Sequence, residues 1–209
     1  NRKQLKCERK TYKMGCKLKR IKSRIRSFGS IMRKRIVIIG GGASGLTAAI
    51  GGARNGAHVT IVEHMDRVGK KILSTGNGRC NLTNLRMEED CYRCGQKGFP
   101  MEVIRGFGVD ETLAFFKGLG IEPKDRNGYI YPNSDQASAV LDVLRSEVER
   151  LGVAVLLSCR VEKIEPAVGG GGVRYKVYTD QGILDAEAVI LAAGSKAAPS
   201  TGSDGSGYE

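Results

Sequence analysis

Three glycines near the start of an apolar segment have the spacing of a phosphate-binding turn. They form Gly40-x-Gly42-x-x-Gly45, directly after a run of β-branched residues and before a predicted helix. In such a turn the first glycine permits the tight bend, the second lets the backbone approach a pyrophosphate, and the third lets the helix pack against the strand. Ala43 and Ser44 lie where free N–H groups and the helix dipole favour negative charge. The spacing therefore predicts a dinucleotide site.

An acidic residue stands where the ribose of such a dinucleotide would lie. Glu63 follows Gly40 by 23 positions and ends the next predicted strand, with His64 directly after it. A carboxylate at this place accepts hydrogen bonds from ribose hydroxyls and repels a 2′-phosphate, which disfavours NADP here. The motif by itself does not separate FAD from NAD. A glycine-rich turn that binds nothing is the alternative interpretation.

A second segment, Gly69–Asn84, is polar and rich in glycine, and we call it the polar loop. It reads GKKILSTGNGRCNLTN. Such a composition packs poorly into a core, whereas its Asn, Thr and Arg side chains and its backbone suit hydrogen bonds to a polar ligand. An ordinary surface loop is the alternative. Cys80 lies in this loop and is expected near a cofactor rather than to act as a nucleophile.

The elements around the motif predict a βαβ unit. Residues 35–40 form a continuous β-branched run, typical of a strand buried on both faces of a parallel sheet. Apolar residues recur at helical spacing over 46–53, and the Asn-Gly pair at 55–56 ends that helix. Residues 57–62 form the second strand. A last apolar strand over 188–192 brings Ala193 and Gly194 towards the same cofactor.

Further helices and strands are predicted along the chain. Asp110 is placed to cap a helix with apolar residues over 113–119, and Ser134 or Asp135 caps a longer one with apolar residues over 140–151. The predicted extended segments are 128–132, 153–157, 173–179 and 182–186, the last two as an antiparallel pair about the turn at 180–182, with a flexible hairpin tip at 169–172.

The positive charge is confined to one end of the chain. The net charge is +12, but residues 1–35 hold 15 of the 34 basic residues and one of the 22 acidic ones, so the remainder has a net charge of −2. We expect residues 1–31 to be a disordered or non-native leader. One explanation for the leader is that translation really begins at Met32 and residues 1–31 come from reading of upstream sequence. Another is that the leader is a mitochondrial-type transit peptide. A nucleic-acid or membrane-surface role for the leader is the weaker interpretation.

The cysteine pattern and the hydropathy of the chain indicate the cellular compartment in which the protein is expected. No stretch approaches 18 apolar residues, and six cysteines show no regular framework, so we expect a cytoplasmic protein with reduced thiols and no membrane partner. Cys91 and Cys94 form a C-x-x-C pair that could be a redox dithiol, half of a zinc site, or incidental thiols in a variable loop. We predict no metal site.

Together these motifs resemble one bacterial family. The chain from Met32 to Tyr208 is similar to the NAD(P)/FAD-dependent oxidoreductases of the BaiN-like flavoprotein family, which includes proteins described as aminoacetone oxidases. The resemblance rests on the runs VIIGGGASG at 37–45, the polar loop, YPNSDQA at 131–137, and LAAGS at 191–195 with TGS at 201–203. It implies an α/β fold: a Rossmann-like FAD-binding domain of glutathione-reductase type, with a parallel sheet and a small antiparallel β-meander.

The resemblance also implies where a cofactor would lie. The glycine motif would hold the pyrophosphate of FAD and Glu63 the adenosine ribose, while Val161 would reach the adenine through its backbone. The residues implied around the flavin are Lys71, Asn77, Arg79 and Cys80.

The activity implied is transfer of hydride between NAD(P)H and an organic substrate through FAD. The substrate would be a small molecule, either an unsaturated ketone that is reduced or a small amine that is oxidised, and no catalytic residue is assigned. Family members continue for about as many residues again. We therefore expect residues 32–209 to be an FAD-binding domain that is incomplete at its C-terminus, without its substrate domain and inactive alone. The alternative is a non-catalytic nucleotide-binding module with an RNA- or membrane-surface-binding leader; nucleic acid is not the expected partner, and the oligomeric state is left open.

Overall fold

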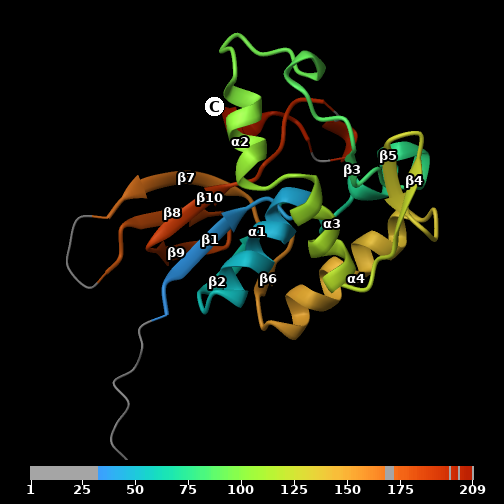
Figure 1. The fold of residues 1–209 in the computed structure, drawn as a ribbon. Helices are drawn as coiled ribbons and strands as arrows, with labels where there is room; N and C mark the ends of the chain where they lie inside the picture. The colour runs from blue at the N-terminus through green and yellow to red at the C-terminus, as the bar shows by residue number, and fades with distance from the viewer. Residues whose placement is uncertain (1–32, 168–171, 198, 202, 209) are drawn as a thin grey trace, which may run out of the picture. The chain divides into compact units, whose positions relative to one another are not determined.

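A computed structural model describes residues 33–167, 172–197, 199–201 and 203–208 (Figure 1). These residues belong to one compact unit that begins at Arg33. The predicted basic leader and residues 169–171 of the predicted hairpin tip lie outside the described residues. Within the described part, no helix is long and apolar enough to cross a membrane.

A four-stranded parallel sheet forms the centre of this unit. Its order is β10 (Ala188–Leu191), β1 (Arg35–Ile39), β2 (His58–Val62) and β6 (Ala154–Leu156). The two inner strands are the β-branched runs of the predicted βαβ unit, and burial of both faces of the sheet explains why they lack polar alternation. These strands confirm the predicted parallel sheet.

Two helices cover one face of the sheet. They are α1 (Ala43–Arg54) and α4 (Ala137–Arg150). Leu46 and Ile50 of α1 and Leu144 of α4 are fully buried in the same core as Ile38 and Ile61 of the sheet. The apolar residues at helical spacing therefore face the sheet, as predicted.

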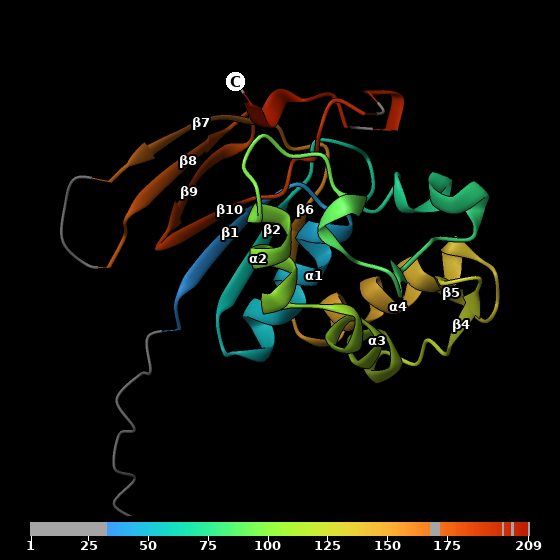
Figure 2. The same cartoon turned by 45° about the horizontal axis from the view of Figure 1, so that its top comes forward.

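A three-stranded antiparallel meander covers the other face. It consists of β7 (Val161–Pro166), β8 (Tyr175–Thr179) and β9 (Gly182–Ala186). Val177 and Ala186 pack there against Val37 and Val62 of the sheet. Figure 2 shows the parallel sheet between this meander and the helices, a three-layer arrangement. The predicted fold class, a Rossmann-like α/β domain with a parallel sheet and a small meander, is confirmed.

A smaller sheet and two short helices complete the described part. The sheet has the order β3 (Thr83–Asn84), β5 (Tyr129–Pro132) and β4 (Pro123–Arg126). The helices are α2 (Phe99–Gly106) and α3 (Val109–Gly118). Only β5 and α3 among these were predicted, because the other elements are short and lack a clear period.

Both predicted helix caps are wrong. The residue before α3 is Gly108 rather than Asp110, and the carboxylate of Glu111 accepts a hydrogen bond from the Gly108 N–H at 2.9 Å. The residue before α4 is Gln136 rather than Ser134 or Asp135. The Asp135 carboxylate accepts hydrogen bonds through Oδ2 from Lys124 at 2.6 Å and from Arg126 instead.

Candidate active site at the carboxyl end of the parallel sheet

A cavity of about 840 Å³ opens at the carboxyl edge of the parallel sheet. The residues that follow β1, β2 and β10 line it, together with the polar loop, the start of β7 and the segment 203–207. In open α/β sheets, ligands bind outside the carboxyl ends of the strands, and pockets for organic ligands commonly measure about 300–1,000 Å³. The cavity therefore has the place and size of a nucleotide site.

The three motif glycines have different surroundings. Gly40 has a φ of 103°, and a Cβ on it would lie 2.4 Å from the carbonyl oxygen of Ala192. A Cβ on Gly45 would lie 1.9 Å from the carbonyl oxygen of Gly40, so this glycine serves close packing of α1 and does not line the cavity. Gly42 lines the cavity, and a Cβ on it would meet nothing within 4 Å.

The N-terminus of α1 is free to bind an anion. Within the described residues, no protein acceptor bonds the N–H groups of Ala43 or Ser44, no side chain caps the helix, and its first turn holds no acidic residue. Both residues line the cavity. Unsatisfied N–H groups and the helix dipole together favour a phosphate here.

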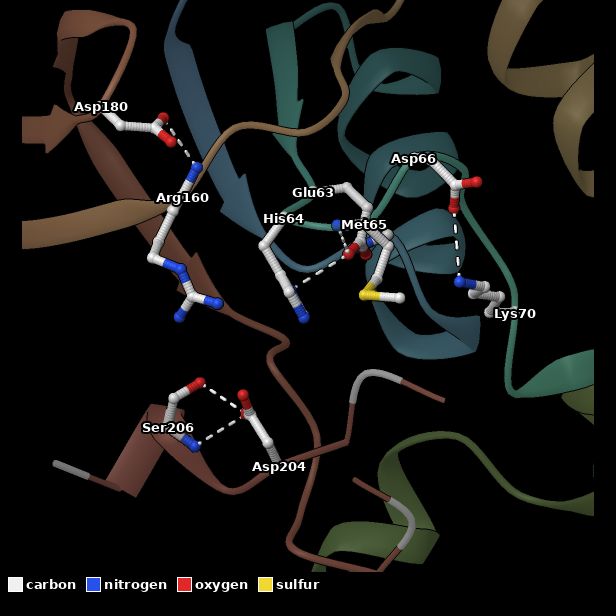
Figure 3. A network of polar contacts seen from close by, with 10 residues as sticks. Glu63, His64, Met65, Asp66, Lys70, Arg160, Asp180, Asp204 and Ser206 are labelled. Atoms are coloured by element: carbon white, nitrogen blue, oxygen red, sulfur yellow. Dashed lines mark hydrogen bonds and ion pairs between the residues drawn. The ribbon is translucent and has the colours of Figure 1, made fainter. Parts of the chain in front are cut away.

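Glu63 ties this turn to the end of β2. Its side chain is 9% exposed, and its Oε2 accepts a hydrogen bond from the Gly41 N–H at 2.7 Å. Its Oε1 accepts one from the Met65 N–H at 2.8 Å and lies 3.2 Å from His64 Nδ1 (Figure 3). Each carboxylate oxygen has two lone pairs, so Glu63 keeps acceptor capacity for a ligand beside it.

A buried serine stands in another part of the cavity wall. Ser203 is 4% exposed; its Oγ accepts a hydrogen bond from Lys71 Nζ at 3.2 Å and donates one to the Ser195 carbonyl at 2.5 Å. A Cβ on Gly194, which has a φ of 80°, would lie 2.8 Å from Ser203 Oγ. Ser203 belongs to the run TGS at 201–203, and no role was predicted for it. Its contacts place the Lys71 ammonium at the wall.

The polar loop has an irregular backbone between Thr75 and Cys80. Gly76, Asn77, Gly78 and Cys80 all have positive φ, between 53° and 79°. Cys80 lines the cavity, and burial raises the pKa of its thiol, which favours the protonated form. Asn77 and Arg79 are exposed and do not line the cavity, unlike the other residues predicted at the flavin.

Further residues of the wall were not recognised in the sequence. Val161, Ala193 and Gly194, which were predicted near the cofactor, line the cavity, as do Lys70 and Asn81 of the polar loop, but Met65 and Arg160 line it without having been predicted. Arg160 carries no sequence signal, because it is a single basic residue between two strands. Only the approach of β7 to the end of β2 brings it to the cavity.

Within the described residues, the cysteines and the potential metal-binding side chains form neither a disulfide nor a metal site. Cys80, Cys91, Cys94 and Cys159 form no disulfide within the described residues. Cys91 and Cys94 are exposed. Across the same ranges of the chain, no three His, Cys, Asp or Glu side chains lie together so as to hold a metal ion.

The fold and this cavity define a Rossmann-type nucleotide-binding domain. Residues 34–209 match the family described as the HI0933-like protein Rossmann domain, and the chain belongs to this family.

Two curated relatives and one solved structure illustrate the family and fold. The chain is 49% identical over 176 residues to a 3-dehydro-bile acid delta(4,6)-reductase of Clostridium scindens, covering 83% of this chain and 42% of that protein. It is 26% identical over 174 residues to a ribosomal RNA dihydrouridine synthase of Haemophilus influenzae, covering 83% and 43%. THI4 of Thermovibrio ammonificans shares the fold with a TM-score of 0.51 and 17% identity, over 78% of this chain and 58% of THI4. The chain thus spans less than half the length of both curated relatives.

Proposed function

We propose that the cavity binds FAD and that the protein is a flavin-dependent reductase. The observation that carries this proposal is the free N-terminus of α1 at the Gly40–Gly45 turn, with Glu63 beside it in the same cavity wall. In this proposal the pyrophosphate lies against the N–H groups of Ala43 and Ser44, where the open space at Gly42 admits it. Residues 32–209 then act as one FAD-binding domain.

The other residues of the cavity fit the two ends of an extended dinucleotide. Glu63 has acceptor capacity left for ribose hydroxyls, and its negative charge disfavours a 2′-phosphate at this end. Lys71 lies with Ser203, Thr75 and Cys80 in the part of the wall formed by the polar loop, which we assign to the flavin. Bound FAD supplies a ring that accepts hydride from one molecule and donates it to another.

The names of the two relatives suggest the substrate class. A 3-dehydro bile acid with double bonds at positions 4 and 6 contains a carbon–carbon double bond conjugated to a ketone. Uridine, from which dihydrouridine is made, contains a carbon–carbon double bond conjugated to a ring carbonyl. We infer that this protein reduces a conjugated enone of the same kind with electrons from NADH or NADPH, and the higher identity favours a steroid ketone.

A second candidate substrate is uridine in RNA. The similarity to ribosomal RNA dihydrouridine synthase is the observation that supports it, together with the predicted basic leader. An RNA substrate would be bound through phosphate contacts, so its reduction should weaken steeply as salt rises. Location in the cytoplasm remains a prediction, and either substrate could be met there.

The activity is tested by anaerobic reduction of the FAD-loaded, full-length protein with NADH or NADPH. Reduced protein is then mixed with a 4-en-3-one steroid or with a uridine-containing RNA, and return of oxidised flavin absorbance is followed. If the oxidised flavin absorbance returns only with the steroid, the favoured substrate class is supported. If it returns only with the RNA, uridine in RNA is supported as the substrate. A protein that takes up no FAD, or whose reduced flavin reacts with neither compound, contradicts the proposal.

The adenosine contact is tested separately through Glu63. Glu63→Ala should weaken FAD binding by about 1.5–3 kcal/mol, the usual contribution of a hydrogen bond to a charged group, which is roughly ten- to a hundredfold in affinity. Glu149→Ala, on the outside of α4, serves as the matched loss of one carboxylate and should leave affinity unchanged. If both variants bind FAD with equal affinity, Glu63 does not contribute to FAD binding.

A further inference from the structure

An arginine outside every recognised motif lines the cavity near Glu63. Arg160 lies directly before β7, and Figure 3 shows its guanidinium extending towards the same space as the ring of His64. Within the described residues, no hydrogen bond or ion pair engages this guanidinium; the hydrogen bonds of Arg160 are made by its backbone N–H and carbonyl. An unpaired guanidinium at a cavity wall is available to a ligand.

The backbone of Arg160 is fixed by the turn between β8 and β9. Its N–H donates to Asp180 Oδ1 at 2.9 Å, and its carbonyl accepts from the Asp180 N–H at 3.1 Å. One residue earlier, the N–H of Cys159 donates to the Glu63 carbonyl at 3.0 Å, and Cys159 is only 1% exposed. The segment is therefore held between the meander and the end of β2, so the Arg160 side chain starts from a defined position.

The surroundings of this guanidinium suit a flat ring better than a phosphate. His64 and Met65 line the same stretch, with Ser206 on the opposite side of the space (Figure 3). Guanidinium groups stack on aromatic faces, and thioethers make favourable contacts with them. The carboxylate of Glu63 nearby opposes a phosphate here, whereas the N-terminus of α1 offers free N–H groups to one.

We propose that Arg160 stacks on the adenine ring of the bound dinucleotide and selects FAD over FMN, with Asp180 as its positioning residue. This inference rests on the proposed FAD site and adds a residue for recognition of the base. Arg160 acts through its planar cation, so lysine cannot replace it fully. Asp180 acts only through the backbone that carries Arg160.

The test compares ligands that carry different parts of FAD. Binding of ADP, inorganic pyrophosphate and FMN to the full chain is measured by calorimetry for the wild type, Arg160→Ala and Arg160→Lys. A cation–π contact of about 1–2 kcal/mol predicts a loss of roughly 5- to 30-fold in ADP affinity for Arg160→Ala and a smaller loss for Arg160→Lys. Pyrophosphate and FMN affinities should not change. Arg174→Ala, an exposed arginine of the meander, is the matched control and should behave as the wild type.

The outcomes separate this inference from the FAD site itself. A wild type that binds FAD and ADP while Arg160→Ala binds ADP equally well overturns the role of Arg160 alone. An equal loss for ADP and pyrophosphate also overturns it, because Arg160 would then contact a phosphate. A wild type that binds neither FAD nor ADP overturns the proposed function as well.

The positioning role of Asp180 is tested by a double-variant cycle. Asp180→Ala should lower ADP affinity less than Arg160→Ala does, and the double variant should lose no more than Arg160→Ala, since Asp180 acts through Arg160. Additive losses would show that Asp180 supports the cavity by another route and would overturn its assignment as a positioning residue.

Discussion

The βαβ unit and the polar loop line the same cavity but are built in different ways. In the unit formed by β1, α1 and β2, regular backbone hydrogen bonds and fully buried side chains such as Ile38, Leu46 and Ile61 set the geometry. In the polar loop (Gly69–Asn84), backbone conformations with positive φ alternate with exposed polar side chains. The first region offers backbone N–H groups to a ligand, and the second offers side chains.

Because of this difference, we expect substitutions in the two regions to affect different properties, folding stability in one and ligand binding in the other. Interiors are close-packed, so a single added methyl group in the βαβ unit is expected to change folding free energy. The polar loop places Ile72 and Cys80 in the core, but its exposed polar side chains contribute few buried contacts, so changes to them should act mainly on the ligand. Three predictions test this division, beginning with the largest effect.

The largest expected effect is on the packing of α1. Gly45→Ala places a methyl group 1.9 Å from the Gly40 carbonyl oxygen, so backbone must shift, and we expect a loss of about 3 kcal/mol in unfolding free energy. Gly51→Ala in the same helix meets nothing within 4 Å and should stabilise by roughly 0.5–1 kcal/mol. Urea unfolding of both variants measures the contrast, and similar midpoints would contradict this account of α1.

A smaller effect is expected where α4 joins α1. Glu147 accepts hydrogen bonds from Arg150 at 2.6 Å and from Arg54 at 2.7 Å, and these contacts lower its pKa from 4.5 to about 2. Glu147→Gln should cost about 1–2 kcal/mol at neutral pH, because bonds between charged groups are lost. The side chains of Arg54 and Arg150 are 40% and 66% exposed, which keeps the cost below that of a fully buried pair.

The lowered pKa of Glu147 also predicts how the stability difference between wild type and Glu147→Gln changes with pH. A carboxylate with a lowered folded-state pKa stabilises above its unfolded pKa, and that stabilisation is lost as pH falls towards the folded value. The difference in stability between the wild type and Glu147→Gln should therefore be constant above about pH 5 and shrink between pH 4.5 and about 2. A difference that does not change over this interval would show that the ion pairs are not the cause.

The smallest effect is expected in the polar loop. Lys71→Met should leave the melting temperature nearly unchanged but weaken FAD binding about 3- to 10-fold, since one cation at the cavity wall is lost. Asn77→Gly suits the positive φ of 53° and changes a side chain off the wall, so it should leave both quantities unchanged. A large loss of affinity for Asn77→Gly would restore the sequence-based prediction that Asn77 contacts the flavin.

The parts of the fold that the sequence predicted are those with local signals. The β-branched runs at 35–40 and 57–62 and the helical period over 46–53 each report burial directly, and the glycine spacing reports the turn between them. Such an element can be predicted without knowledge of distant residues, because its signal lies within its own sequence.

The parts that were missed depend on contacts between distant residues. β7 escaped because its register shifts between Val161 and Lys163, which breaks the alternation of a strand. Asp135 was expected to cap α4, but Lys124 and Arg126 from β4 hold its carboxylate. Ser203 and Arg160 reach the cavity only through the tertiary fold.

The most direct test of the central claim is titration of FAD into Gly42→Val beside the wild type. Gly42 lines the cavity, and a Cβ on it meets no protein atom within 4 Å, so the variant should fold with an unchanged melting temperature. It should bind FAD at least about 100-fold more weakly, a loss of ~2.7 kcal/mol, because the added side chain fills the space assigned to the pyrophosphate. FAD binding of equal strength by wild type and variant would contradict a dinucleotide site at this turn.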